Sequence, residues 1–196
     1  MSEHRHHAPG VARPALAIRD LTVDFQRRSG TLRTVDKVNL DVWPKEIVGV
    51  IGESGSGKTM TALSAMRLLP HGARIGGTIE LGGRDIVNLG EPEMRALRGD
   101  RIALIPQDAM QSLNPTMRVG RQVGEPYEFH RKQSYGAIWS KVVELLRAVK
   151  IADPETRARE YPHQFSGGMQ QRAMIATGLA LDPELIIADE PTTALD

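Results

Sequence analysis

Residues 52–59 have the sequence GESGSGKT and follow the apolar run EIVGVIG at residues 46–52. The octapeptide has the form G-x-x-x-x-G-K-[ST], in which glycines let the backbone turn tightly and direct its amide hydrogens towards an anion. The preceding run is short, continuous and rich in β-branched residues, which is typical of a strand buried on both faces. TMTALSAMRLLP, at residues 59–70, has helical spacing and ends at a proline. Strand, loop and helix together predict a phosphate-binding loop in an α/β fold.

Each residue type in this loop has a physical role towards a nucleoside triphosphate. The Lys58 ammonium can reach the β- and γ-phosphates, and the Thr59 hydroxyl can bind Mg²⁺. A glycine-rich turn that matches by chance is the competing explanation, and the flanking strand and helix patterns argue against it. The loop does not reveal what the energy of the nucleoside triphosphate is used for. The residues expected to bind the nucleotide here are Gly52, Glu53, Ser54, Gly55, Ser56, Gly57, Lys58 and Thr59.

Two acids follow the last apolar run of the chain, LIIADE at residues 185–190. At the end of a parallel strand beside a phosphate-binding loop, Asp189 can hold the Mg²⁺ shell. Glu190 is then placed to accept a proton from an attacking water. Paired acids at a strand end are often a solvated turn, so this pattern becomes informative through the loop upstream. It predicts hydrolysis of the nucleotide as well as binding.

FSGGMQQR, at residues 165–172, is a second segment that suits an anion. Ser166 is a suitable N-cap, and the glycines after it expose backbone amides at a helix N-terminus. A capped helix start with no ligand is the simpler alternative. A second phosphate site about a hundred residues after the first is explained if two subunits pair head to tail. Each γ-phosphate would then contact one subunit's loop and the other's serine.

Composition describes an ordinary globular protein with one domain and room for an inserted subdomain. The 196 residues are 40% hydrophobic and 25% charged, with a formal net charge of +1, so nucleic acid is not an expected partner. The absence of cysteine excludes disulfides and thiolate metal sites. No stretch has the roughly 18 apolar residues of a membrane span. We expect residues 1–14 to be a disordered tail without the apolar region of a secretory signal.

The rest of the chain predicts a mixed sheet with parallel central strands and packed helices. Residues 16–25 and 35–43 alternate in polarity and read as antiparallel neighbours. The region at about residues 108–165 lacks strand patterns, and we expect it to be a helical insertion. The other expected elements are strands at 77–83, 101–107 and 184–190, and helices at 91–98, 119–132, 140–151 and 166–181.

In combination, these segments resemble the ATP-binding subunit of ABC (ATP-binding cassette) transporters. GESGSGKT resembles the family's Walker A motif, SGGMQ its signature, LIIADE its Walker B motif and TTALD its D-loop. RIALIPQD, at residues 101–108, resembles the strand leading to the Q-loop, with Gln107 as its glutamine. Phe25 stands where the family has an aromatic residue that stacks on adenine. The resemblance covers about residues 16–196 and implies a P-loop NTPase domain with an antiparallel β subdomain and a helical subdomain.

The resemblance also implies a mechanism in which ATP and Mg²⁺ lie between two such subunits. Asp189, Gln107 and Thr59 would hold the metal, and Glu190 with Gln107 would act on the water. Asp196 would belong to the loop that crosses the dimer interface. The segment expected to complete the site of the opposite subunit is Ser166, Gly167, Gly168 and Gln170.

PQDAMQSLNP and YPHQFSGGMQQR are similar to the branch that imports dipeptides, oligopeptides and nickel. Pro106 and Ala109 depart from that branch, which commonly has an aromatic residue and a proline there. The implied partners are a second ATPase subunit, two membrane permeases and, indirectly, an extracytoplasmic binding protein. The implied location is the cytoplasmic face of the cell membrane. The transported solute is not readable from these residues.

The family places a further strand with a γ-phosphate-contacting histidine after the D-loop, and all six histidines here precede Asp189. We therefore expect a C-terminally incomplete domain over residues 15–196 that lacks strands and hydrolyses little ATP by itself. Two alternatives to a transport ATPase remain. One is a soluble ABC ATPase acting on DNA or ribosomes, although the chain lacks the coiled coils and cysteines common there. The other is a nucleotide-binding module deficient in hydrolysis.

Overall fold

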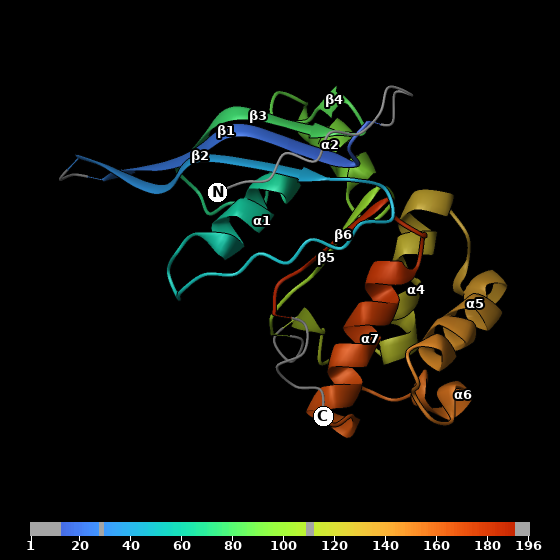
Figure 1. The fold of residues 1–196 in the computed structure, drawn as a ribbon. Coiled ribbons are helices and arrows are strands. Elements are labelled where there is room, and N and C mark those ends of the chain that lie inside the picture. The colour runs from blue at the N-terminus through green and yellow to red at the C-terminus, as the bar shows by residue number, and fades with distance from the viewer. Residues whose placement is uncertain (1–12, 28–29, 109–111, 191–196) are drawn as a thin grey trace.

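The computed structural model describes residues 13–27, 30–108 and 112–190, and Figure 1 shows a sheet-based part beside a helical part. The larger sheet has four antiparallel strands in the order β2-β1-β3-β4. They are β1 (Leu16–Arg27), β2 (Gly30–Val42), β3 (Ala73–Leu81) and β4 (Arg84–Asp85). The predicted antiparallel pairing of the first two runs is confirmed.

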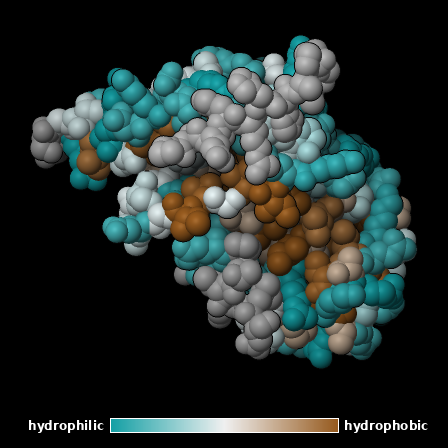
Figure 2. All heavy atoms as spheres, in the orientation of Figure 1, coloured by the Kyte–Doolittle hydropathy of each residue, from teal (hydrophilic) through white to brown (hydrophobic). Residues whose placement is uncertain are grey.

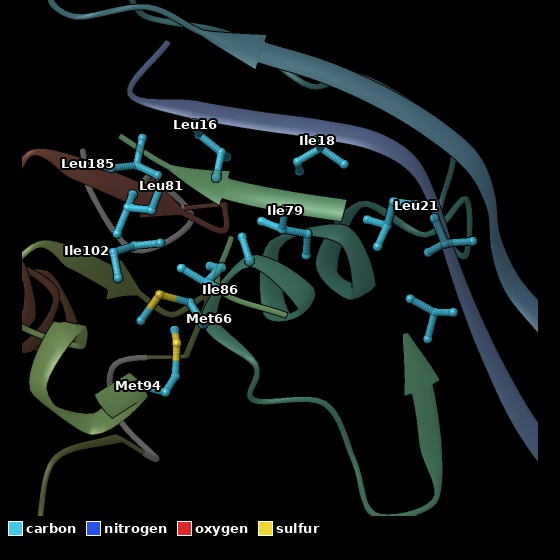
Figure 3. Packing of buried hydrophobic residues seen from close by; sticks show 13 residues of the cluster. Leu16, Ile18, Leu21, Met66, Ile79, Leu81, Ile86, Met94, Ile102 and Leu185 are labelled. Atoms are coloured by element: carbon cyan, nitrogen blue, oxygen red, sulfur yellow. The ribbon is translucent and has the colours of Figure 1, made fainter. Parts of the chain in front are cut away.

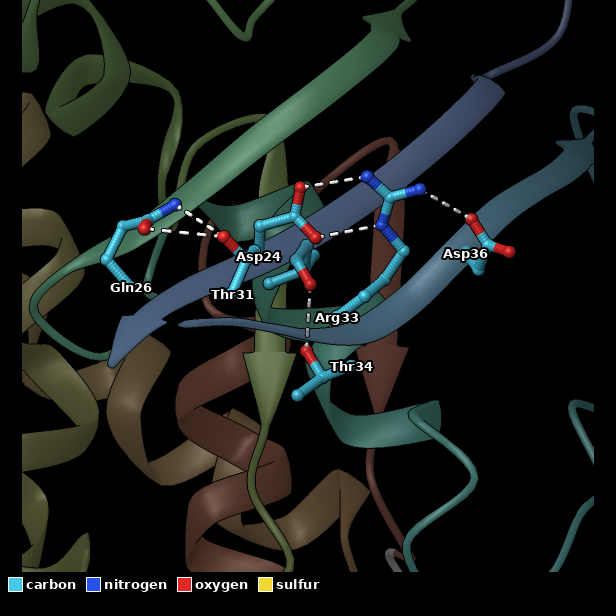
Figure 4. Close-up of polar contacts among 7 residues, drawn as sticks. Asp24, Gln26, Thr31, Arg33, Thr34 and Asp36 are labelled. Carbon is cyan, nitrogen blue, oxygen red and sulfur yellow. Dashed lines mark hydrogen bonds and ion pairs between the residues drawn. The ribbon is translucent and has the colours of Figure 1, made fainter. Parts of the chain in front are cut away.

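The β1–β2 hairpin extends past the rest of the sheet as a two-stranded ribbon (Figure 1). Arg33 of β2 donates across the hairpin to both carboxylate oxygens of Asp24 in β1, at 2.9 and 3.1 Å, and along its own strand to Asp36 at 3.0 Å (Figure 4). These hydrogen bonds from Arg33 hold the pKa of Asp24 below its ordinary value. Gln26 and Thr31 pair further along, at 3.1 Å. All of these groups face water, so they align the strands more than they stabilise the fold.

The main core lies between this sheet and helices α1 (Lys58–Met66) and α2 (Glu91–Leu97). Ile18 and Ile79 from the sheet and Met66 and Met94 from the helices lie in it, each at most 3% exposed (Figure 3). Each fully buried side chain of this size contributes roughly 1.5–3 kcal/mol. α1 is shorter than predicted because Arg67, with φ 50°, turns the chain left-handed before Pro70 is reached.

A second, parallel sheet consists of β5 (Ile102–Ile105) and β6 (Leu185–Ala188), with Ile102 opposite Leu185. Both strands are continuous apolar runs, as parallel strands usually are. Parallel pairing is thus confirmed for this pair, but the prediction of a single mixed sheet is wrong, because among the described residues the parallel strands form a sheet of their own beside the antiparallel one. Its ladder continues past β6, where the Asp189 N–H donates to the Ile105 carbonyl at 3.0 Å. Parallel neighbours end at the same edge, so the residues after β5 and β6 meet.

The chain between β5 and β6 is helical where the structure describes it. Apolar residues recur every three or four positions, so Val119 and Val123 form one stripe and Ile138, Val142 and Leu146 another; all five are fully buried in a second core. The exact limits of the predicted helical insertion stay a prediction. The elements here are α4 (Val119–Arg131), α5 (Tyr135–Ala148), α6 (Pro154–Arg157), the 3₁₀ helix η1 (Pro162–Gln164) and α7 (Gly167–Leu179).

The prediction of a buried strand at residues 46–52 is wrong. This run has no regular secondary structure, and Ile47 and Ile51 are 98% and 96% exposed. A strand is stable when neighbouring strands satisfy its backbone N–H and C=O groups. Among the described residues, no strand pairs with this run. The apolar sequence is suited to burial, but no partner encloses it in this structure.

An apolar groove of about 530 Å³ lies between this run and β6, and we call it the central groove. The four-stranded sheet and α1 contribute its other walls. Figure 2 shows apolar residues gathered in the middle of this face of the molecule. Exposed apolar surface of this kind favours association with other chains. Residues that line it include Leu16, Ile18, Leu40, Ile47, Val50, Ala62, Ala65, Leu185 and Ile187.

Candidate nucleotide-binding and hydrolysis site

The loop at residues 52–57 leads into an α1 N-terminus that is open to an anion. Gly57 is the N-cap, with φ 92°, and Gly55 has φ 81°. A Cβ atom on Gly57 would come within 2.9 Å of the Thr34 carbonyl oxygen, so a side chain there is excluded by space as well as by backbone angle. No side chain caps α1. Its first amide hydrogens and the positive end of its dipole are therefore available to a phosphate.

The Lys58 side chain folds back onto the backbone of the loop that precedes it. Its ammonium donates to the carbonyl oxygens of Gly52 at 2.8 Å and Glu53 at 2.9 Å. A phosphate oxygen is a stronger acceptor for an ammonium than a neutral carbonyl, because the hydrogen bond is then charged on both sides. A nucleotide can therefore take over these hydrogen bonds. The phosphate contact of Lys58 stays a prediction.

Thr59 joins the phosphate-binding helix to the end of β6. Its hydroxyl donates to Asp189 Oδ2 at 2.9 Å, although the two residues are 130 positions apart. Both were predicted from the sequence as Mg²⁺ ligands, and the fold brings them together. This contact places the end of β6 at the glycine loop before α1.

Gln107 and Glu190 form a second pair beside the first. Gln107 follows β5 and Glu190 follows β6, and Gln107 Nε2 donates to Glu190 Oε2 at 2.5 Å. The pairing follows from the shared edge at which the two parallel strands end. Glu190 has φ 45°, a left-handed conformation that costs a residue with a side chain roughly 1 kcal/mol or more. Such local strain is common where a side chain must be aimed at a reacting group.

The oxygen atoms of Thr59, Asp189 and Gln107 suit Mg²⁺ in their chemistry. Mg²⁺ prefers hydroxyl, carboxylate, amide and water oxygens, and it is usually held by one or two carboxylates together with substrate phosphates. Within the described ranges, no group of three His, Cys, Asp or Glu side chains could hold a metal by itself. The oxygen donors present fit Mg²⁺ in their chemistry, and a bound Mg²⁺ would be held by these three residues.

The signature segment forms a capped helix start, as its sequence predicts. The Ser166 hydroxyl oxygen accepts a hydrogen bond from the Met169 N–H at 3.3 Å, and α7 begins at Gly167. Ser166 is exposed, and Gly167 and Gly168 are partly exposed in the first turn. No hydrogen bond or ion pair links this segment to the phosphate-binding loop in the described part of the chain. The two candidate anion sites of one chain are thus separate.

Gln170 lies inside the protein, away from the exposed start of α7. It is 6% exposed, and its amide donates to the carbonyl oxygens of Pro162 at 2.9 Å and Phe165 at 3.4 Å. These contacts support the loop that carries Ser166, and the predicted contact with nucleotide stays untested. Gln122 is a comparable buried glutamine that sequence reasoning missed. Nothing in a single glutamine within a helical pattern distinguishes it beforehand.

Phe25 and Asp196 are the two remaining predicted contacts. Phe25 lies in β1, partly buried against the sheet core, with Leu32 and Ala73 opposite it on the neighbouring strands. Its stacking on adenine stays a prediction. Asp196 lies outside the described residues. Within the part of the chain that the structure describes, no helix has the length and apolarity to cross a membrane.

A phosphate-binding loop at a sheet edge, next to two carboxylates at the end of a parallel strand, defines a P-loop nucleotide-binding protein. Comparison with protein families narrows this class. The family model described as "ABC transporter" matches residues 35–193. The chain therefore belongs to the ABC transporter family, and the resemblance noted in the sequence is confirmed.

Curated relatives are peptide transport proteins. The chain is 50% identical over 183 residues to the probable peptide ABC transporter ATP-binding protein of Sinorhizobium fredii, covering 92% of this chain and 55% of that protein. It is 45% identical over 196 residues to the oligopeptide transport ATP-binding protein OppD of Salmonella typhimurium, covering 100% and 58%. The chain thus spans a little over half the length of the curated relatives it matches.

Solved structures agree with the fold. A dimeric structure of the bacterial ABC transporter cassette MJ0796 superimposes with a TM-score of 0.82 and 27% identity, covering 92% of this chain and 76% of that one. A dimeric post-hydrolysis state of the same cassette, with bound ADP and Pi, gives a TM-score of 0.81. The predicted fold class, a P-loop ABC nucleotide-binding domain, is therefore confirmed.

Proposed function

We propose that this chain binds and hydrolyses ATP to drive the uptake of peptides, or of a related small solute, across the cell membrane. The observation that carries the proposal is the meeting of the Thr59–Asp189 and Gln107–Glu190 pairs beside the phosphate-binding loop. These contacts join a nucleotide-binding helix to a carboxylate that can act on water. The printed names of the relatives favour peptides as the solute.

The proposed chemistry divides among the residues by position. Lys58 and the loop amides bind the phosphates, and the open end of α1 stabilises their charge. Glu190 accepts a proton from the attacking water, and Gln107, already hydrogen-bonded to it, orients that water. Bound Mg²⁺ would neutralise charge on the β- and γ-phosphate oxygens at Thr59, Asp189 and Gln107.

A second ATPase subunit is the partner that the separate signature segment favours. Ser166, Gly167 and Gly168 would contact the phosphates bound by the partner subunit, and Asp196 would lie in the loop between them. Dimeric assemblies of the similar cassette MJ0796 support this arrangement. ATP would close the pair of subunits, and its hydrolysis would release them.

Two membrane permeases are the further proposed partners, at the cytoplasmic face of the membrane. A groove of about 740 Å³ lies between β5, α4, α7 and the chain after α1, and we call it the helical groove. Leu68 and Phe129 in it are 44% and 48% exposed, and charged residues surround them. An apolar centre with a charged rim fits an amphipathic helix of a permease. An extracytoplasmic binding protein would contribute indirectly, by delivering the solute.

Hydrolysis is tested with the purified chain, ATP and Mg²⁺, using Glu190→Gln as the matched variant. Loss of the general base lowers kcat by about 10²–10⁴-fold, while binding of a fluorescent ATP analogue stays within about twofold. Equal rates in the wild type and in Glu190→Gln, with ATP binding intact, would contradict hydrolysis through Glu190.

The second candidate function is a nucleotide-binding module that hydrolyses little ATP. The exposed run at residues 46–51 favours it, because the chain that leads into the phosphate-binding loop then adds little packing to support the Thr59–Asp189 contact. The same assay separates the two functions. The module is supported if Lys58→Ala weakens nucleotide binding while Glu190→Gln has no effect on turnover.

Transport is tested by uptake of a radiolabelled tripeptide into cells that carry the wild type or Phe129→Asp. We expect Phe129→Asp to abolish uptake while ATP binding by the purified variant is retained, because a buried carboxylate at the centre of a docking groove is unfavourable. Uptake equal to that of the wild type would exclude the helical groove as the permease contact. Uptake unaffected by deletion of the whole gene would exclude the transport function.

A further inference from the structure

Gln122, on α4, is a buried polar side chain whose hydrogen bonds to described residues go to one loop. It is 6% exposed, and its amide NH₂ donates to the carbonyl oxygens of Asn114 at 3.0 Å and Met117 at 2.8 Å. Its carbonyl oxygen accepts the Asn114 N–H at 2.8 Å. One side chain thus satisfies three backbone groups at the two ends of residues 114–117.

The chemistry of these contacts requires an uncharged amide. A glutamine carries two N–H donors and an acceptor oxygen on one planar group. Here both donors and the acceptor are used. Glutamate would have no donor for the two carbonyls, and leucine would have neither donor nor acceptor. Leaving buried backbone groups without partners costs about 1–3 kcal/mol each, so the loop would move to regain them.

The stapled loop is continuous with the segment that carries Gln107. Leu113, just before it, is buried at 4% exposure, and the Ser112 hydroxyl donates to the Asp108 carbonyl at 2.6 Å. The Ser112–Asp108 hydrogen bond thus joins the residue after Gln107 to the residues just before the loop that Gln122 holds. The Gln107 segment is therefore held by Glu190 on one side and by α4 on the other.

We propose that Gln122 is a positioning residue, which fixes the Gln107 segment to α4 and so holds the Gln107 amide at Glu190. This inference rests on the proposed hydrolysis of ATP and deepens it. Gln122 lies outside the nucleotide-binding loops and acts through the loop it staples.

α4 extends this role beyond the site. Pro126 and Phe129 follow Gln122 by four and seven residues, so all three lie along one side of the helix. Both line the helical groove. Displacement of α4 by a partner in that groove would pass to Gln107 through the Gln122 hydrogen bonds. Gln122 thus links the proposed docking surface to the proposed water-activating pair.

The kinetic test compares Gln122→Leu with Val142→Ala, a core variant in α5 that lowers stability without contacting the loop. We expect Gln122→Leu to lower kcat about tenfold, with KM for ATP within about twofold of the wild type, because a small misplacement affects the transition state more than nucleotide binding. Val142→Ala should leave both parameters within about twofold. A kcat for Gln122→Leu equal to that of Val142→Ala would overturn the proposal, and so would a parallel rise in KM.

A structural readout keeps the inference testable if hydrolysis is too slow to measure. The chain has no cysteine, so spin labels can be placed at Asp108→Cys and Ala137→Cys without competing sites. In the parent and in Val142→Ala we expect one narrow distance distribution between the labels, and in Gln122→Leu a distribution about twice as broad, since the staple is gone. Identical distributions in all three would refute the positioning role while leaving the proposed ATPase function untouched.

Discussion

The two helix N-termini that can bind phosphate, at α1 and at α7, differ in what supports them. Ser166 caps α7, and Gln170 holds the loop before it from inside the helical core. α1 has a glycine cap, and the run that leads to it, at residues 46–51, lies exposed beside the central groove. Both helices therefore begin at a candidate anion site. The loop before α7 is held by the protein core, whereas the run before α1 is not. A binding motif is set by local sequence, but its rigidity is set by distant partners.

The difference has an energetic basis in burial. α7 lies in a cluster whose central residues, among them Val123 and Ile138, are fully buried. At the other N-terminus, Ile47 and Ile51 contribute almost nothing to folding, because their side chains remain in water. Ile138 and Ile47 thus allow a direct comparison of what burial contributes to stability, since the two side chains are identical.

The largest expected effect is on folding stability. Ile138→Ala should lower the free energy of unfolding by about 2–5 kcal/mol, because it leaves a cavity in the helical core. Ile47→Ala should change it by less than about 0.5 kcal/mol. Urea denaturation followed by circular dichroism measures both. A loss for Ile47→Ala comparable to that for Ile138→Ala would show that residues 46–51 are buried in solution and remove the contrast.

The second effect is on nucleotide binding. Lys58→Ala should weaken ATP binding by about 10- to 100-fold, since a charge-assisted hydrogen bond contributes about 1.5–3 kcal/mol. Ser166→Ala should leave binding to the isolated chain within about twofold and instead lower stability by about 1 kcal/mol through loss of the N-cap. Titration with a fluorescent ATP analogue, alongside thermal denaturation, checks both. Weaker binding in Ser166→Ala at low protein concentration would mean that both sites act in one chain.

Sequence predicted the local features of the site well. The glycine turn before Lys58, the Ser166 cap and the acids after β6 depend on neighbours in the chain, so residue type and spacing suffice. The meeting of Gln107 with Glu190 also follows once two apolar runs are read as parallel strands. The hydrophobic pattern also distinguished the helical region from the sheet, because the pattern of a helix or strand depends on neighbours in the chain.

The features that sequence missed depend on contacts between distant segments. EIVGVIG has the pattern of a buried strand, but pairing requires a neighbour that pattern cannot supply. The Gln122 and Gln170 staples are invisible because glutamine is usual on exposed helix faces. The register of β1 with β3 packs the Phe25 ring partly against the core. The alternation of polar and apolar residues in β1 alone does not specify that register.

A third prediction concerns the exposed surface of the central groove. Ile47→Lys combined with Val50→Lys should reduce binding of the dye ANS by about half, because two exposed apolar side chains of one groove wall are replaced while the other walls remain. Stability should change by less than about 0.5 kcal/mol. The matched control is Leu32→Lys, an exposed apolar residue on the hairpin away from the groove. An equal decrease in dye binding for the control would show that the dye does not report on the groove.

The smallest expected effect is on stability and concerns the C-terminus of α1, which α2 supports. Arg98 donates to the Met66 and Arg67 carbonyls at 2.8 and 3.2 Å, and it also pairs with Glu91 at 2.6 Å, so α2 anchors the C-terminus of α1. The hydrogen bond from Arg98 holds the pKa of Glu91 below its ordinary value of 4.5. A carboxyl whose pKa is lowered by folding contributes stability above its ordinary pKa and loses it as the pH falls below that value.

Glu91→Gln should therefore lower the melting temperature slightly at pH 7, and the difference from the wild type should shrink as the pH falls below 4.5, the ordinary pKa of this carboxyl. Because Glu91 is exposed, salt should reduce the difference as well. Melting curves from pH 3 to 7 at two salt concentrations test both statements. A difference that persists unchanged at pH 3 would mean that Glu91 acts through packing and not through its charge. In that case the anchoring of α1 would depend on the backbone hydrogen bonds of Arg98 alone, and Arg98→Lys would be the variant that loosens it.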